Sequence, residues 1–298
     1  MRDSDPVPAQ PQSEMIVTAN GPVEVVVVGT GRPCLVLHGG HGSCFDPFGL
    51  EEVRRAGMMA VVPSRPGYGR TDIAVGRTPA AAADTFVAMM RRLDLSTYSV
   101  LGISAGGPTA LSLAARHPDV VDRLVLESAV ADVWLRPNSA KYRMARVLFH
   151  PRWENKTWRG YRALARLAPG LAIRSLVPSL STRRSKEVLA ELDESDCLCI
   201  IDMISRQRSG RGFVQDLEAQ VPTFELERIT APTLVVHSIH DGAVSISHAR
   251  RAGRIIDHAQ LVELDTWGHL IWLGSTANQI VDDVAEFLRA DPAEDVDN

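Results

Sequence analysis

The chain has 298 residues, of which 45% are hydrophobic and 23% are charged. This length and composition suit a globular protein with one α/β domain and an insertion. The formal net charge of −4 weighs against nucleic acid as a partner. No apolar run is long enough for an integral membrane segment, and residues 1–14 lack the apolar part of a signal peptide. We therefore expect a flexible tail over residues 1–14 and a cytoplasmic location.

Short runs rich in Val and Leu predict five strands in the first part of the chain. They span residues 22–29, 33–38, 58–63, 97–103 and 121–126. Apolar residues at helical spacing predict helices over residues 78–95 and 107–117, the second stopped by Pro118. Strands that alternate with helices are typical of a parallel sheet with helices on both faces.

The middle of the chain, residues 133–221, contains no convincing strand. Helices are predicted over residues 140–149, 158–167, 182–192 and 197–208, with prolines 151, 169 and 178 between them. The segment holds 16 Lys and Arg against 9 Asp and Glu. Solvated helix faces explain this charge, and attraction of an anionic substrate or membrane surface is the alternative. The pattern predicts a helical lid, or cap, over a site.

The last part resumes the alternation, with strands near residues 232–236 and 260–264 and helices over 247–256 and 276–289. The fold class predicted is therefore α/β, with a mostly parallel central sheet flanked by helices. Its core comprises residues 15–132 and 222–298. The all-helical cap, residues 133–221, is inserted between the region of the sixth strand and the strand that precedes Asp241.

The heptapeptide GISAGGP, residues 102–108, places Ser104 in a G-x-S-x-G motif between a predicted strand and a predicted helix. That context is typical of a nucleophile elbow, in which small neighbours let the strand and helix approach and the serine hydroxyl projects into a site. The helix N-terminus then favours developing negative charge. Ser104 is the candidate nucleophile.

A nucleophilic serine needs a base, and the base needs an orienting acid. His269 follows a predicted strand in the loop DTWGH, at the carboxyl edge of the sheet where open α/β folds place their sites. Asp241 follows another strand, in HSIHDGA, and Glu127 and Asp265 are rival acids. We expect His269 as base and Asp241 as acid, and His248 as a surface group on a helix.

Acyl chemistry also needs donors for an oxyanion. The glycine-rich stretch HGGHG, residues 38–42, follows a strand, and the predicted oxyanion hole comprises the backbone amides of Gly40 and Ala105. His41 is the alternative donor, and a merely flexible loop is the alternative interpretation. His41, Trp134 and Trp267 are candidate substrate-binding residues, although packing explains such aromatic residues equally well.

Four cysteines are present, at positions 34, 44, 197 and 199, without the spacing of a zinc site. Cys197 and Cys199 are two positions apart, so on a helix their side chains would point in different directions. We expect free, mostly buried thiols and no metal site.

These blocks together resemble the α/β-hydrolase fold superfamily. LHGGHG, SRPGYGRTD, GISAGGP, HSIHDGA and TWGH look like its recurring blocks in their usual order, over residues 22–288. The resemblance implies a serine hydrolase with a helical lid, a small-molecule acyl substrate and no metal or organic cofactor. The turn beginning at Arg65 resembles a block whose role in the family is largely structural.

The leading hypothesis is a serine esterase that acts through an acyl-enzyme on small or medium carboxylic esters. A C–C bond hydrolase, an acyltransferase or a perhydrolase would use the same residues, and a ligand-binding receptor could keep the same fold. The sequence leaves the substrate and the oligomeric state open, a homodimer being one expectation.

Overall fold

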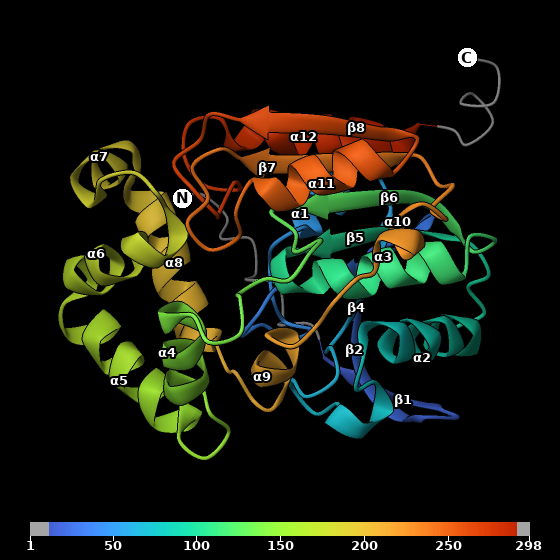
Figure 1. Cartoon of the computed structure of the whole chain (residues 1–298), viewed down its shortest axis with the longest axis horizontal. Coiled ribbons are helices and arrows are strands. Elements are labelled where there is room, and N and C mark those ends of the chain that lie inside the picture. The colour runs from blue at the N-terminus through green and yellow to red at the C-terminus, as the bar shows by residue number, and fades with distance from the viewer. Residues whose placement is uncertain (1–11, 291–298) are drawn as a thin grey trace, which may run out of the picture.

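The computed structural model describes residues 12–290 and is built around one eight-stranded sheet (Figure 1). The strands are β1 (Glu14–Thr18), β2 (Gly21–Val28), β3 (Pro33–Leu37), β4 (Met59–Pro63), β5 (Tyr98–Ile103), β6 (Val121–Glu127), β7 (Thr233–Ser238) and β8 (Ala259–Leu264). Their order across the sheet is β1-β2-β4-β3-β5-β6-β7-β8. The pairs β1–β2 and β2–β4 are antiparallel, and the other neighbours are parallel. The predicted α/β fold with a mostly parallel sheet is confirmed.

Helices cover both faces of the sheet. One face packs against α2 (Pro79–Arg92), α3 (Gly107–Arg116) and α11 (Ser247–Ile255), and the other against α1 (Leu50–Arg55) and α12 (Ala277–Arg289). The strands between them are almost continuously apolar because both faces are buried. All six residues of β5 are buried, for example. Catalytic chemistry in such folds sits at the carboxyl ends of the strands, outside this core.

Local sequence explains where the helices begin. The Thr78 side chain accepts a hydrogen bond from the Ala81 amide at the start of α2, and Pro79 occupies the first helical position. A proline is well tolerated there because its missing N–H would have no acceptor within the helix. Phe86, Met89 and Met90 recur on one side of α2 and are fully buried.

Helices also fill the chain between β6 and β7. They are α4 (Ala140–Leu148), α5 (Glu154–Leu167), α6 (Pro169–Leu180), α7 (Ser185–Glu191), α8 (Glu194–Arg206), α9 (Gly212–Asp216) and α10 (Thr223–Leu226). We call residues 140–216, from α4 to α9, the helical insertion. Figure 1 shows α4 to α8 gathered at one end of the sheet. Helices α5 to α8 share a small apolar core with Trp267, Leu270 and Leu273 from the loop after β8.

Some local expectations were wrong. Pro169 opens α6 and Pro178 lies inside it, whereas the sequence predicted that both would separate helices. His248, predicted at the surface, is buried and accepts the backbone amides of Ala131 and Asp132. The short helix α1 and the strand β1 were not predicted. The predicted tail lies outside the described residues except at its end, where Glu14 already belongs to β1.

Candidate active site

Ser104 lies on a sharp turn between β5 and α3. Its backbone φ is 49°, in the left-handed region that L residues rarely adopt. The turn passes close to the end of β3: a Cβ added at Gly106 would lie 2.2 Å from the carbonyl oxygen of Leu37, the last residue of that strand. Only glycine fits at position 106 without a shift of the backbone. The strained serine therefore sits at the carboxyl edge of the sheet, directly before the first turn of α3.

The fold brings Ser104, His269 and Asp241 together from three different loops. Nε2 of His269 lies 3.0 Å from Oγ of Ser104, and Nδ1 of His269 lies 2.6 Å from Oδ2 of Asp241. The His269 backbone is held on both sides. Its carbonyl accepts the Ser128 hydroxyl at 2.9 Å, and its amide donates to the Leu180 carbonyl of the helical insertion at 2.8 Å. All three predicted residues are nearly buried.

Asp241 remains ionised in this buried place because several donors face it. Burial alone would raise its pKa, but the charge that His269 carries when protonated and hydrogen bonds from His237 and His269 lower that pKa to about 2. The other carboxylate oxygen, Oδ1, accepts the amides of Ala243 and Val244, each at 2.8 Å. Because a carboxylate only accepts hydrogen bonds, the proton on the His269 ring is assigned to Nδ1, and Nε2 is free to accept from Ser104.

The rival acids have other partners. Oε2 of Glu127 accepts the indole N–H of Trp272 at 3.1 Å, and burial raises the pKa of Glu127. Asp265 is exposed and pairs with His240 at 3.0 Å. Of the three carboxylates considered, Asp241 is the one that contacts the His269 ring.

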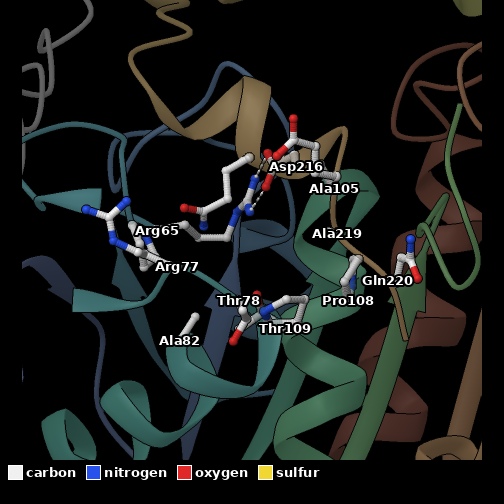
Figure 2. Close-up of a pocket in the computed structure, with 14 residues that line it drawn as sticks. Arg65, Arg77, Thr78, Ala82, Ala105, Pro108, Thr109, Asp216, Ala219 and Gln220 are labelled. Carbon is white, nitrogen blue, oxygen red and sulfur yellow. Dashed lines mark hydrogen bonds and ion pairs between the residues drawn. The ribbon is translucent and has the colours of Figure 1, made fainter. Parts of the chain in front are cut away.

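The loop of residues 38–42 lies against the Ser104 turn. A Cβ built at Gly39 would lie 3.3 Å from Cβ of Ser104, and one at Gly40 would lie 3.8 Å from Cβ of Ala105. The backbone amides of Gly40 and Ala105 therefore belong to segments in contact with each other. Figure 2 shows Ala105 at the top of a pocket that opens beside the start of α3.

His41, the alternative donor, faces the helical insertion. Its Nδ1 lies 2.8 Å from the Ser209 hydroxyl, and its ring stacks on Phe213 with centroids 4.0 Å apart. Phe149 and Trp158 complete the aromatic surroundings of the ring. Burial, with a smaller effect of the Arg65 charge, lowers the pKa of His41 to about 3, so this imidazole is neutral.

The two candidate tryptophans have different surroundings. Trp134 is half-buried, donates its indole N–H to the Ala243 carbonyl at 2.8 Å and meets the edge of Phe213. Trp267 is buried, donates to the Leu273 carbonyl at 3.2 Å and packs against the helical insertion. Trp267 therefore has the contacts of a packing residue, whereas the indole of Trp134 is bonded to the loop that carries Asp241.

Sequence reasoning missed three polar residues that surround this site, His237, Ser209 and Asp216. His237 stands four positions before Asp241 in HSIHD, and that spacing was the available signal. Ser209 and Asp216 meet His41 and Arg65 from more than 140 positions away in the chain. Contacts across such a distance in sequence follow from the path of the helical insertion alone.

Residues 12–290 contain no group of three or more His, Cys, Asp or Glu side chains that could hold a metal ion. The four cysteines are free thiols, two buried and two half-buried. In the same residues no helix has both the length and the apolar character needed to cross a membrane.

A sequence profile of the alpha/beta hydrolase fold matches residues 32–275. The chain is 38% identical over 279 residues to an uncharacterised hydrolase of Bacillus subtilis, YcgS, a match that covers 93% of this chain and 98% of the relative. It is also similar to the solved structure of an alpha/beta hydrolase fold protein from Nakamurella multipartita. That match has a TM-score of 0.79 and 32% identity and covers 93% of this chain and 99% of the other.

An esterase from Exiguobacterium antarcticum has the same architecture, with a TM-score of 0.69 over 94% of this chain and all of the other. The two sequences are 19% identical, so this likeness concerns the fold alone.

Proposed function

Because this chain belongs to the α/β-hydrolase fold family, we propose that it is a serine hydrolase that cleaves carboxylic esters. The observation that carries the proposal is the chain of contacts from Ser104 to His269, at 3.0 Å, and from His269 to Asp241, at 2.6 Å. These distances are within hydrogen-bond reach, which is the first requirement for a nucleophile and its base. The name of the Bacillus subtilis relative, an uncharacterised hydrolase, agrees with this class.

In the first step Oγ of Ser104 attacks the ester carbonyl carbon while its proton passes to Nε2 of His269. Asp241, ionised at neutral pH, stabilises the imidazolium and holds the ring in the correct tautomer. The carbonyl oxygen becomes an oxyanion, which the amides of Gly40 and Ala105 stabilise, aided by the N-terminus of α3. His269 then gives its proton to the alcohol oxygen as the C–O bond breaks, leaving an acyl group on Ser104.

In the second step His269 takes a proton from a water molecule, whose oxygen attacks the acyl carbon. The second oxyanion uses the same two amides. Its collapse breaks the bond to Oγ, which recovers the proton from His269, and the carboxylic acid leaves. Ester and water are converted into acid and alcohol, and the protein returns to its initial state without any cofactor in the scheme.

The side chains around the loop of residues 38–42, which carries Gly40, favour a substrate with an apolar group. We define the aromatic cluster as His41, Trp134, Phe149, Trp158 and Phe213, which are linked by ring contacts. A Cβ built at Gly40 would lie 3.4 Å from the Phe213 ring, so the cluster adjoins the amide that would bind the oxyanion. Ser104 is only 6% exposed, which favours small or medium esters over polymeric ones.

The test is labelling with a fluorophosphonate, which reacts with activated serines, alongside hydrolysis of a panel of esters that vary in acyl length and alcohol size. We expect labelling at Ser104, turnover of at least one short ester, and loss of both in Ser104→Ala by a factor of about 10³ or more. The matched control is Ser205→Ala, which removes an exposed hydroxyl from α8.

An unlabelled Ser104, or ester turnover that survives Ser104→Ala, would contradict the proposal. Product analysis by mass spectrometry adds a further check. Carbon–carbon cleavage or transfer of the acyl group to an acceptor other than water, in place of ester hydrolysis, would also overturn it.

A further inference from the structure

The peptide unit between Gly39 and Gly40 is held from its carbonyl side. The Gly39 carbonyl accepts Nδ1–H of His38 at 2.7 Å and Nη2–H of Arg65 at 3.2 Å. The N–H of the same peptide is the Gly40 amide, which the proposed function uses as an oxyanion donor. Since a trans peptide is planar, fixing the carbonyl also fixes the direction of this N–H, which points the opposite way.

Arg65 is itself fixed to this loop at two other points. Its Nε donates to the His38 carbonyl at 2.7 Å, and its backbone amide donates to Nε2 of His38 at 2.9 Å. The second bond leaves the ring proton of His38 on Nδ1, so that this atom is the donor to Gly39. Burial and then the charge of Arg65 lower the pKa of His38 well below its ordinary value, which keeps the ring neutral and in this role.

The guanidinium group is oriented by Asp216. Nη1 and Nη2 of Arg65 meet the two carboxylate oxygens of Asp216, each at 2.8 Å, and the Tyr68 hydroxyl donates to Oδ2 of Asp216 at 2.5 Å. Both side chains of the pair are buried, 4% and 6% exposed. Figure 2 shows the two groups joined in the wall of the pocket that also contains Ala105. Bidentate contact fixes the plane of a guanidinium group as well as its distance.

Asp216 is the last residue of α9, where the helical insertion returns to the sheet. The helix is tightly joined to the turn that carries Arg65, because the Gly67 carbonyl accepts the amides of Arg211 and Gly212 at 3.0 and 3.1 Å. Glycine is required at both contacts. A Cβ at Gly67 would lie 2.5 Å from the Gly212 nitrogen, and one at Gly212 would lie 2.2 Å from the Tyr68 ring.

We propose that Asp216 is a positioning residue for the oxyanion hole, and that it acts through Arg65 on the Gly39–Gly40 peptide. The inference rests on the proposed function and extends it to a residue of the helical insertion. A charged donor on the Gly39 carbonyl polarises the peptide, which makes the Gly40 N–H a stronger donor. Without the Asp216 carboxylate, the Arg65 guanidinium loses the bidentate contact that fixes its plane, beside a cavity of about 240 Å³ that leaves it room to move.

The primary variant is Asp216→Asn, which keeps the shape of the side chain but removes its charge and turns an amide N–H₂ toward Arg65. We expect kcat to fall about tenfold with KM nearly unchanged, because a weakened oxyanion donor acts on the transition state and not on the bound ester. The affinity for phenylboronic acid, which forms a tetrahedral adduct with a reactive serine, should fall by the same factor.

A milder variant keeps the test valid if Asp216→Asn folds poorly. Tyr68→Phe removes only the hydroxyl that donates to Asp216 and should lower kcat and boronate affinity together by a smaller factor. The matched control is Asp84→Asn, which breaks a similar bidentate contact, between Asp84 and Arg116, on the surface. Melting temperatures of all variants are recorded beside the kinetics.

A merely structural role would lower the melting temperature and leave kcat and boronate affinity of the folded protein at the wild-type values. That result overturns the inference, as does a rise in KM at constant kcat. Failure of the proposed function has a different signature, since the wild-type protein would then show neither ester turnover nor fluorophosphonate labelling of Ser104.

Discussion

Nε2 of His237 lies 3.1 Å from Oδ2 of Asp241, the same carboxylate oxygen that faces Nδ1 of His269 at 2.6 Å. His237 is fully buried at the end of β7 and also reaches the Val244 carbonyl at 2.9 Å. Two imidazoles therefore share one oxygen of the acid. The second of them contributes to keeping Asp241 ionised.

The first prediction concerns His237→Leu, which removes this donor and fills much of the same volume. A hydrogen bond to a charged group contributes about 1.5–3 kcal/mol, so we expect a loss of stability in this range and a several-fold lower kcat. Urea unfolding monitored by circular dichroism, with ester kinetics on the same samples, measures both. His258→Leu, at an exposed position outside the site, is the control.

The second prediction concerns acid unfolding. The pKa of Asp241 is lowered from 3.8 to about 2 in the folded protein, so its contribution to stability is complete above pH 3.8 and disappears as the pH falls through about 2. In His237→Leu the pKa of Asp241 rises, and acid unfolding should begin at a higher pH than in the wild type. Circular dichroism between pH 5 and pH 2, recorded for both proteins, tests this; coincident acid-unfolding curves would contradict it.

The third prediction concerns two buried carboxyl groups outside the site, Glu52 and Glu127. Burial raises the pKa of both, that of Glu52 to about 7. The charge of Glu51 adds to the effect on Glu52, and the charge of Glu52 adds to the effect on Glu127. Each has one carboxyl oxygen, Oε1, without a hydrogen-bond partner in the chain as described from residue 12 to 290. For an acid whose pKa is raised by folding, stability decreases as the pH rises from 4.5, the ordinary value for Glu52, toward about 7.

Glu52→Gln should therefore stabilise the protein at pH 8 by about 1–3 kcal/mol and change its stability little at pH 4. Differential scanning calorimetry at the two pH values measures the effect. The neighbouring Glu51 is the control, because Arg54 and Arg55 lower its pKa to about 2 and Glu51→Gln should give no gain at pH 8. Equal effects of Glu52→Gln at both pH values would contradict the prediction.

The fourth prediction concerns the close approach of β3 and the Ser104 turn. Gly106→Ala places a methyl group 2.2 Å from the Leu37 carbonyl oxygen and should destabilise the protein by about 3 kcal/mol, the upper part of the range for overpacking. Gly160→Ala, inside α5 with nothing within 4 Å of its added Cβ, should instead stabilise by about 0.5–1 kcal/mol. A melting-temperature comparison decides; equal shifts for the two variants would refute the packing argument.

Much of the fold could be predicted because the signals are local. The runs of Val and Leu in β5 and β7 must be buried on both faces, and the pattern of α12 leaves one apolar side. The errors in the predicted helices also come from local signals. Pro169 and Pro178 carry a breaking signal, but the first turn of α6 needs no N–H at Pro169, and packing of Ile173 and Val177 outweighs the bond lost at Pro178.

Some features of the candidate site could be predicted from the sequence, and others could not. Ser104, Asp241 and His269 each follow a strand, and the carboxyl ends of parallel strands meet at one edge, so their proximity was foreseeable from the sequence. The sequence favoured Asp241 as the acid but left Glu127 as a rival, because both carboxylates lie at the carboxyl ends of strands. In the structure Glu127 is turned toward Trp272 and Asp241 toward His269.

By itself the sequence determined the alternation of strands and helices, the strained glycine-rich turn at Ser104 and the order of the polar loops, since these depend on residues close together in the chain. Only the tertiary structure decided which side chains meet across long separations. The contacts of His41 with Ser209 and of Arg65 with Asp216 join the loop of residues 38–42 and the turn after β4 to a helical insertion whose path no local pattern encodes. The physical reason is that apolar periodicity specifies which face is buried, whereas the partner of a buried charge depends on how the whole chain packs.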